Sequence, residues 1–146
     1  MDRILDRAES GPVFLKQPDI AQMVVQAVID GGRHFKRYEL HSFVVMANHV
    51  HMLVTTSTRT CDWVRSLKGF TGHEANRILN RRNQYLWQDE SFDRLVRTDE
   101  EFSRIRHYIE WNPVKAGLVM SPEEFPWSGP TPGRSPAAGR KACPHL

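Results

Sequence analysis

The stretch that decides the fold is YELHSFVVMANHVHMLVT (38–55), in which two apolar runs flank a short interruption. Both runs, Tyr38–Met46 and His49–Thr55, are rich in β-branched and aromatic residues, which favour extended strands. Ala47-Asn48 lies between them, and asparagine tolerates the positive φ of tight turns. The stretch therefore predicts a β-hairpin. Side chains alternate between the faces of a strand, so two sets are expected on its second strand: Val50, Met52 and Val54, and opposite them His49, His51 and Leu53.

Helical patterns lie on both sides of this hairpin. Upstream, Pro18-Asp19 starts a helix that Gly31-Gly32 is expected to end. Downstream, an apolar repeat of helical period runs from Thr60 to about Arg82. A further helix opens at the capping box of Thr98 and Glu101, and Pro113 is expected to limit its carboxyl end.

The order of these elements predicts the fold class. Tyr85–Val96 is expected to be extended, which gives the order helix, strand, strand, helix, strand, helix. Helices flanking an antiparallel sheet form an α+β fold, most simply a ferredoxin-like one. A complete ferredoxin-like unit has a strand before its first helix, and only Pro12–Leu15 offers a candidate. The first strand is therefore expected to be missing or truncated.

The chain is expected to form one domain over residues 1–128. Residues 129–146 follow it, and the first eleven of them hold three glycines and three prolines. This composition predicts a disordered tail.

Several classes of protein are excluded by composition and motif content. No apolar run is long enough to span a membrane, and the amino-terminal residues lack the apolar region of a signal peptide. Cys61 and Cys143 are the only cysteines, which argues against a disulfide scaffold and favours a cytoplasmic protein. No serine-protease triad, glycine-rich phosphate loop or HExxH zinc motif is present.

Positive charge is concentrated in one predicted helix. The net charge is only +3, but Arg59–Arg82 holds six basic residues against two acidic ones. Such a local excess suits the phosphate backbone of a nucleic acid, although a solvated surface is the simpler explanation of charge alone. The residues expected to contact phosphate are Arg65, Lys68, Arg77 and Arg81.

Two pairs of residues have the spacing of a catalytic site. His49 and His51, at i and i+2 on a strand, share one face and can reach the same cation. Tyr108 and Asn112, at i and i+4, share one face of the last helix. For each pair a structural role remains open: partly exposed strand histidines, a core tyrosine, and an asparagine that stops the helix before Pro113.

Two segments resemble a known family. VVMANHVHMLV (44–54) resembles the histidine-hydrophobic-histidine strand of the HUH-type single-tyrosine transposases. LWQDESFDRLVRTDEEFSRIRHYIEWNPVKAGLV (86–119) is similar to the second signature of that family, and is closest to the REP-associated tyrosine transposases, in which Asn-Pro-Val-Lys-Ala-Gly shortly follows a tyrosine. The family has proline where this chain has Ala47.

The resemblance implies a mechanism and a set of partners. Tyr108 would be the nucleophile, and His49, His51 and Asn112 would hold a divalent metal, Mg²⁺ or Mn²⁺. The substrate would be hairpin-bearing single-stranded DNA, cut through a covalent 5′-phosphotyrosine, with Lys115 among the DNA contacts. Members are often dimeric, so a homodimer associated with the nucleoid is also implied. Two alternatives remain: an inactive hairpin-binding relative, and a metal-dependent phosphodiesterase that uses water.

Overall fold

The computed structural model describes residues 14–87, 94–130 and 141–142. These residues form an antiparallel sheet of strand order β3-β5-β2-β1-β4, together with three α-helices, and the α+β class is confirmed. In chain order the elements are η1 (Phe14–Lys16), α2 (Pro18–Arg33), β1 (Glu39–Val45), β2 (Val50–Thr55), α3 (Thr60–Ile78), β3 (Leu95–Val96), α4 (Asp99–Lys115), η2 (Pro122–Glu124), β4 (Ser128–Pro130) and β5 (Lys141–Ala142). None of the described helices is long and apolar enough to cross a membrane.

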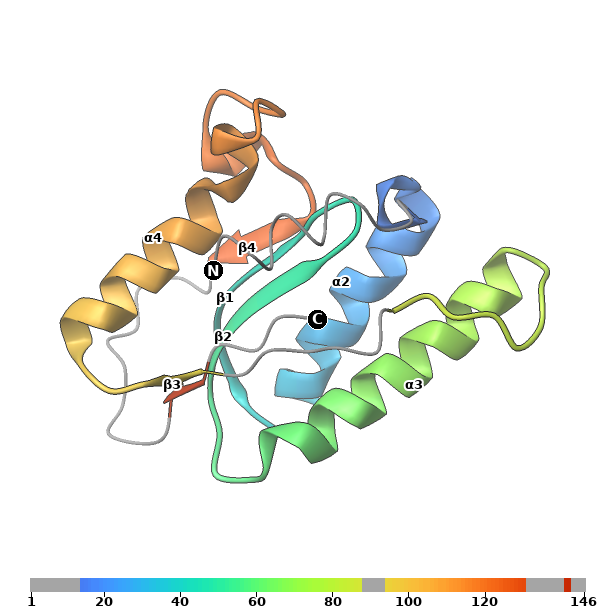
Figure 1. Ribbon diagram of the computed structural model, residues 1–146, viewed down its shortest axis with the longest axis horizontal. Helices are drawn as coiled ribbons and strands as arrows, with labels where there is room; N and C mark the ends of the chain where they lie inside the picture. The colour runs from blue at the N-terminus through green and yellow to red at the C-terminus, as the bar shows by residue number, and fades with distance from the viewer. Residues whose placement is uncertain (1–13, 88–93, 131–140, 143–146) are drawn as a thin grey trace.

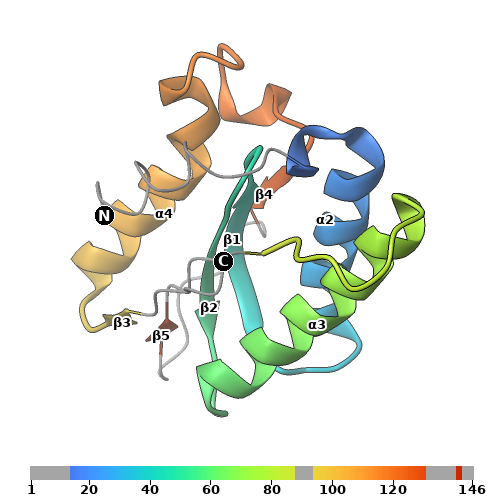
Figure 2. The same ribbon diagram turned by 45° about the vertical axis from the view of Figure 1, so that its right-hand side comes forward.

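The sheet is covered on both faces. Helices α2 and α3 pack on one face and α4 packs on the other, which Figure 2 shows with the sheet seen nearly along its plane. Val50, Met52 and Val54 belong to the core under α2 and α3, whereas Leu53 belongs to the core under α4. The predicted alternation of side chains along the hairpin is therefore confirmed.

A β-bulge interrupts the pairing of the two central strands. The register of β1 with β2 shifts between Leu40 and Ser42, so that His41 lies at the irregularity. Phe43, two residues after His41, packs with the core under α2 and α3, but the ring of His41 stands edge-on to Phe102 of α4, 5.1 Å between centroids. The bulge thus turns His41 to the α4 side, where a regular strand would not place it.

Two of the predicted helix ends differ from the structure. Gly31-Gly32 does not end α2, which continues to Arg33. Pro113 does not end α4 either, since the helix continues to Lys115. Proline there removes only one backbone hydrogen bond near the end of the helix. Just beyond the end of the helix, Gly117 has a φ of 76°. There Leu118 donates a hydrogen bond to the Pro113 carbonyl, and Gly117 donates one to the Val114 carbonyl.

The residues before α2 do not form a strand where they are described. Phe14 and Leu15, half of the strand candidate, belong to the short helix η1, and Pro12 and Val13 lie outside the described residues. Of the extended segment expected over 85–96, only Leu95–Val96 is a strand, and residues 88–93 lie outside the described part.

The carboxyl-terminal residues contribute two strands to the sheet. Gly129 and Pro130 complete β4 on the edge of β1, and β5 pairs with both β2 and β3. For these residues the prediction of a disordered tail is wrong. Composition favoured disorder, but an open strand edge offers hydrogen-bonding groups that a short segment can satisfy. Glycine is needed at 129, because a Cβ there would lie 2.8 Å from the ring of Phe43.

The contact between α2 and Tyr38 provides a test of this packing. The Tyr38 hydroxyl donates a hydrogen bond to the Val28 carbonyl, and a Cβ at Gly31 would collide with that hydroxyl and lie 2.9 Å from ring carbon Cζ. We expect Gly31→Ala to lower the free energy of unfolding by about 1–3 kcal/mol, measured by urea denaturation. Gly32→Ala is the matched control, since its Cβ would approach no atom closer than 3.4 Å. Equal stability of the two variants would contradict the close approach at Gly31.

Candidate active site

The hairpin and α4 bring three aromatic rings together. His49 follows the turn and His51 lies on β2, and their ring centroids are 4.6 Å apart. The ring of Tyr108 on α4 stands edge-on to His51, with 5.8 Å between centroids. Residues far apart in the sequence thus form one contiguous cluster.

The environment of His49 suits a metal ligand. Its Nδ1 lies 2.8 Å from the Asn48 side-chain oxygen, which can only accept, so Nδ1 carries the hydrogen and Nε2 the lone pair. That Nε2 is buried and has no hydrogen-bond partner among the described residues. Burial lowers the pKa of His49 to about 4, so the imidazole is neutral at pH 7. A neutral, oriented imidazole with an available nitrogen is the form that binds cations.

Tyr108 and Asn112 lie on the side of α4 that faces the sheet. Tyr108 is half-buried and packs at the margin of the core formed by Ile105 and Ile109, and Asn112, one turn further along, is buried. Within the described part of the chain, no three His, Cys, Asp or Glu side chains are grouped to hold a metal. A third protein ligand would therefore need a different donor, and the amide oxygen of Asn112 is of the required kind. Its role as a ligand remains a prediction.

The predicted phosphate contacts lie on two sides of the sheet. Lys115 is exposed near the end of α4, on the same helix as Tyr108. Arg65 and Lys68 belong to α3, on the opposite face, and Arg77 and Arg81 lie at its carboxyl end. The structure therefore does not bring these four residues to the tyrosine.

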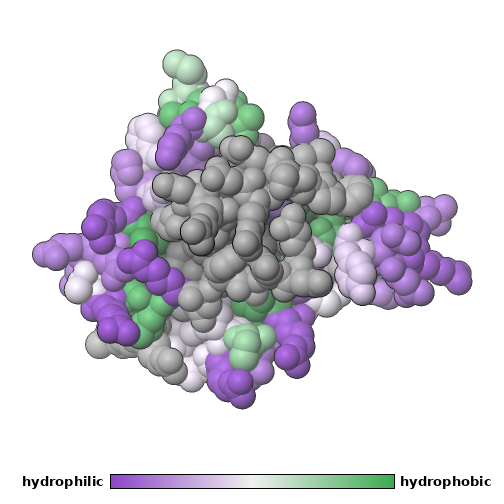
Figure 3. Space-filling view, in the orientation of Figure 1, coloured by the Kyte–Doolittle hydropathy of each residue, from purple (hydrophilic) through white to green (hydrophobic). Residues whose placement is uncertain are grey.

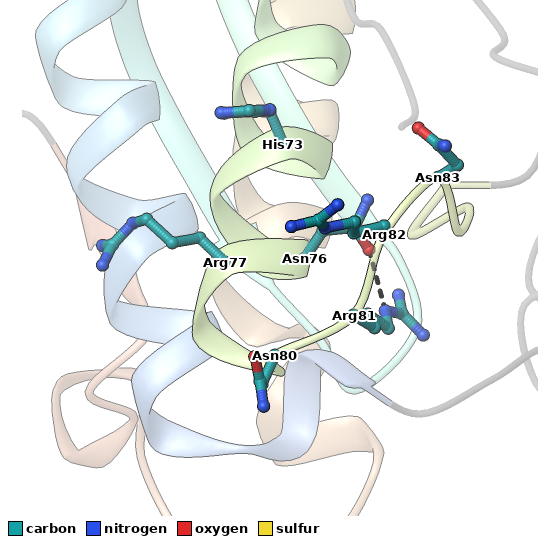
Figure 4. Close-up of a pocket in the computed structure, with 7 residues that line it drawn as sticks. All are labelled: His73, Asn76, Arg77, Asn80, Arg81, Arg82 and Asn83. Atoms are coloured by element: carbon teal, nitrogen blue, oxygen red, sulfur yellow. Dashed lines mark hydrogen bonds between the residues drawn. The ribbon is translucent and has the colours of Figure 1, made fainter.

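Arg77 and Arg81 line a hollow of about 490 Å³ beside the end of α3, which we call the basic hollow (Figure 4). Figure 3 shows hydrophilic side chains gathered over this end of the molecule, at the right of the view. The Nε of Arg81 donates to the Asn76 side-chain oxygen at 2.8 Å, and Arg77 pairs with Glu74 at 3.0 Å. The other lining residues are His73, Asn80, Arg82 and Asn83.

Sequence reasoning missed the contact that Asn48 makes with the site and the position of His41 on the same side of the sheet. Asn48 was assigned only to the turn, but it also orients His49. His41 was treated as a surface or structural residue, yet the bulge buries it on the α4 side, where its Nε2 lies 2.7 Å from the Thr55 hydroxyl. The position of Asn48 directly before His49 was a sequence signal for this contact. No signal in the sequence marked the bulge at His41.

Comparisons with known proteins show the family and the fold of this chain. Residues 15–112 match the family model described as IS200-like transposase. The REP-associated tyrosine transposase of Escherichia coli (strain K12) is 28% identical over 111 residues, which cover 73% of this chain and 62% of the relative. This chain thus matches less than two thirds of that relative. A solved REP-associated tyrosine transposase, bound to a REP hairpin, shares the fold with a TM-score of 0.58 and 24% identity, over 82% of this chain and 68% of the other.

The hydrogen bond from His49 to Asn48 yields a prediction about metal affinity. We expect Asn48→Ala to weaken Mn²⁺ binding about 10- to 100-fold, because the orienting acceptor is lost. Isothermal titration calorimetry measures the change. Asn48→Asp keeps an acceptor oxygen and should bind nearly as well as the original protein, and replacing both His49 and His51 by alanine should abolish binding. Unchanged affinity in Asn48→Ala would refute the orienting role.

Proposed function

Because this chain belongs to the IS200-like transposase family, we propose that it nicks and rejoins single-stranded DNA through a covalent 5′-phosphotyrosine formed by Tyr108. The observation that carries the proposal is the contiguous cluster of His49, His51 and Tyr108. One buried face of the sheet thereby combines the Tyr108 phenol with two imidazole rings, and the low pKa of His49 keeps its ring neutral at pH 7. This combination suits phosphoryl transfer better than a purely structural role, since buried polar groups destabilise a core that does not use them.

In the proposed reaction, the Tyr108 oxygen attacks a backbone phosphorus. The new bond joins the tyrosine oxygen to the 5′-phosphate, the bond from phosphorus to the 3′-oxygen breaks, and the phenolic proton ends on the released 3′-hydroxyl, directly or through water. The phosphoester energy is conserved in the intermediate. A 3′-hydroxyl can then attack the phosphotyrosine, restore the phenol and join the strands without a nucleotide cofactor.

A divalent cation fits the side chains of this site. His49 and His51 would hold it, with Asn112 as the proposed third ligand. When bound, Mg²⁺ or Mn²⁺ would neutralise a phosphate oxygen and so favour attack at phosphorus. Two imidazoles favour Mn²⁺ over Mg²⁺, which prefers oxygen ligands. His49 contributes by staying neutral and oriented, and Tyr108 by lying next to His51.

We propose that the substrate is hairpin-bearing DNA. Support comes from the basic hollow at the end of α3, which lies on the far side of the sheet from Tyr108. A hairpin stem held by Arg65, Lys68, Arg77 and Arg81 would be a different segment from the single strand that is cut. The solved relative is itself bound to a REP hairpin. A homodimer, which the family resemblance implies, is part of the same proposal.

The nucleophile is tested by trapping the intermediate. With a labelled hairpin oligonucleotide and Mn²⁺, we expect a protein–DNA adduct that survives denaturing electrophoresis. Tyr108→Phe should abolish the adduct while leaving DNA affinity unchanged, because it removes a single oxygen. Tyr85→Phe is the matched control, since Tyr85 is 85% exposed and lies outside the cluster.

Three other outcomes would contradict the assignment in different ways. An adduct in Tyr108→Phe would place the nucleophile elsewhere. Cleavage without any adduct would favour the water-using phosphodiesterase. Tight binding without cleavage, under all metal conditions, would identify a hairpin-binding relative that has no activity.

The basic hollow is tested by charge reversal. We expect Arg77→Glu combined with Arg82→Glu, two lining residues of the hollow, to weaken hairpin binding and to reduce the slope of log K against log salt by about 1 for each lost phosphate contact. Fluorescence anisotropy at several salt concentrations gives both quantities. Arg97→Glu is the control for a change of charge away from the hollow, because Arg97 is exposed and lies just before α4, which covers the other face of the sheet. If the salt slope does not change, the hollow does not hold the DNA backbone.

A further inference from the structure

A line of side chains runs along α4 at the edge of its solvent side and includes the half-buried Tyr108. Arg104, Tyr108, Trp111 and Lys115 are spaced at i, i+4, i+7 and i+11. At 3.6 residues per turn these positions fall within about 60° of one another around the helix axis. Phe102, Ile105 and Ile109 lie on another side of the helix and pack against the sheet. The nucleophile thus stands at the boundary between the buried face and an accessible strip.

Trp111 is unusual for a side chain on such a strip. It is 42% exposed, and it belongs to neither apolar core of the described residues. Its ring stacks on His107, one turn earlier, with 5.5 Å between centroids and 20° between ring planes. His107 therefore covers the face of the indole that points toward the amino end of α4. The other face is directed toward the carboxyl end, where Lys115 follows one turn later.

The charges on α4 give the strip a direction. Arg104 shares a shallow hollow with Asp99 and Glu100, whose carboxylates disfavour a phosphate there. Beyond Tyr108 the only acidic residue of the helix is Glu110, and Arg106 binds it at 3.0 Å. Lys115 is exposed, and no ion pair is recorded for it among the described residues. A polyanion leaving Tyr108 would therefore follow the helix toward Lys115.

We propose that Trp111 and Lys115 form a track for unpaired nucleotides next to the phosphate that Tyr108 attacks. The indole stacks on one base, and the ammonium of Lys115 contacts the backbone beyond it. This inference rests on the proposed function for the role of Tyr108, but the binding that it describes does not require cleavage. Stacking on an aromatic ring is available only to a base that is not enclosed in a duplex. The track would thus contribute to a preference for single-stranded DNA beside the cut.

The track is tested with two oligonucleotides, a hairpin with a single-stranded flank and the same hairpin without it. Binding is measured in EDTA, where no metal-dependent cleavage occurs. We expect Trp111→Ala to weaken binding of the flanked hairpin about 10- to 100-fold, the range that loss of one stacked base gives. Affinity for the unflanked hairpin should not change. Trp111→Phe should restore most of the loss, and Lys115→Gln should lower the salt slope for the flanked hairpin by about 1.

The control and the contrary outcomes keep the track separate from the rest of the proposal. Leu118→Ala removes another exposed apolar side chain beyond the end of α4, 57% exposed, and should leave both affinities unchanged. The track would be overturned if Trp111→Ala bound the flanked hairpin as tightly as the wild-type protein does. It would also be overturned if Trp111→Ala lost affinity equally for both oligonucleotides. If no adduct forms at Tyr108 but the selective loss in Trp111→Ala is observed, the proposed chemistry fails and the track stands.

Discussion

Side chains of β2 alternate between two buried faces, and this alternation determines where each candidate catalytic group lies. Both faces of the strand are buried, since four of its side chains have no exposed surface: Val50, Met52, Leu53 and Val54. A slip of one residue would place His51 under α2 and α3 and force Met52 under α4. The apolar residues of the hairpin therefore fix the histidines opposite Tyr108, although they take no part in the chemistry.

Burial of the histidines has an energetic consequence. His51 is 1% exposed and His49 is 9% exposed, and a charged imidazole in such a place would be strongly desolvated. The depressed pKa of His49 and its hydrogen bond to Asn48 show how the fold resolves this: the ring stays neutral, with one nitrogen satisfied. The other nitrogen of His49, Nε2, has no hydrogen-bond partner among the described residues. A buried nitrogen in this state lowers the stability of the fold, and binding of a cation would offset that cost.

The sequence predicted what depends on local periodicity. The two strands, the capped helix of Tyr108 and the shared face of His49 and His51 all follow from spacings of two or about four residues. The bulge at His41 could not be predicted, because it depends on pairing register between two strands. The strands β4 and β5 were missed for a similar reason, since their pairing depends on edges formed by distant residues. Helix packing is also non-local, so the sequence did not show that α3 and Tyr108 lie on opposite faces.

That separation constrains what kind of DNA could use both surfaces. Helices α3 and α4 lie on opposite sides of the sheet in Figure 1, so the sheet separates the hollow at the end of α3 from the strip along α4. A duplex is stiff over tens of base pairs, so a short uninterrupted one could not contact both faces without a strong bend. A hairpin joined to a flexible single strand meets the requirement at lower cost, because the stem can remain on one face while the unpaired nucleotides pass around the sheet. Under the proposed function, the arrangement of charge on this fold therefore favours a substrate with a paired segment and an unpaired one over a duplex of uniform structure.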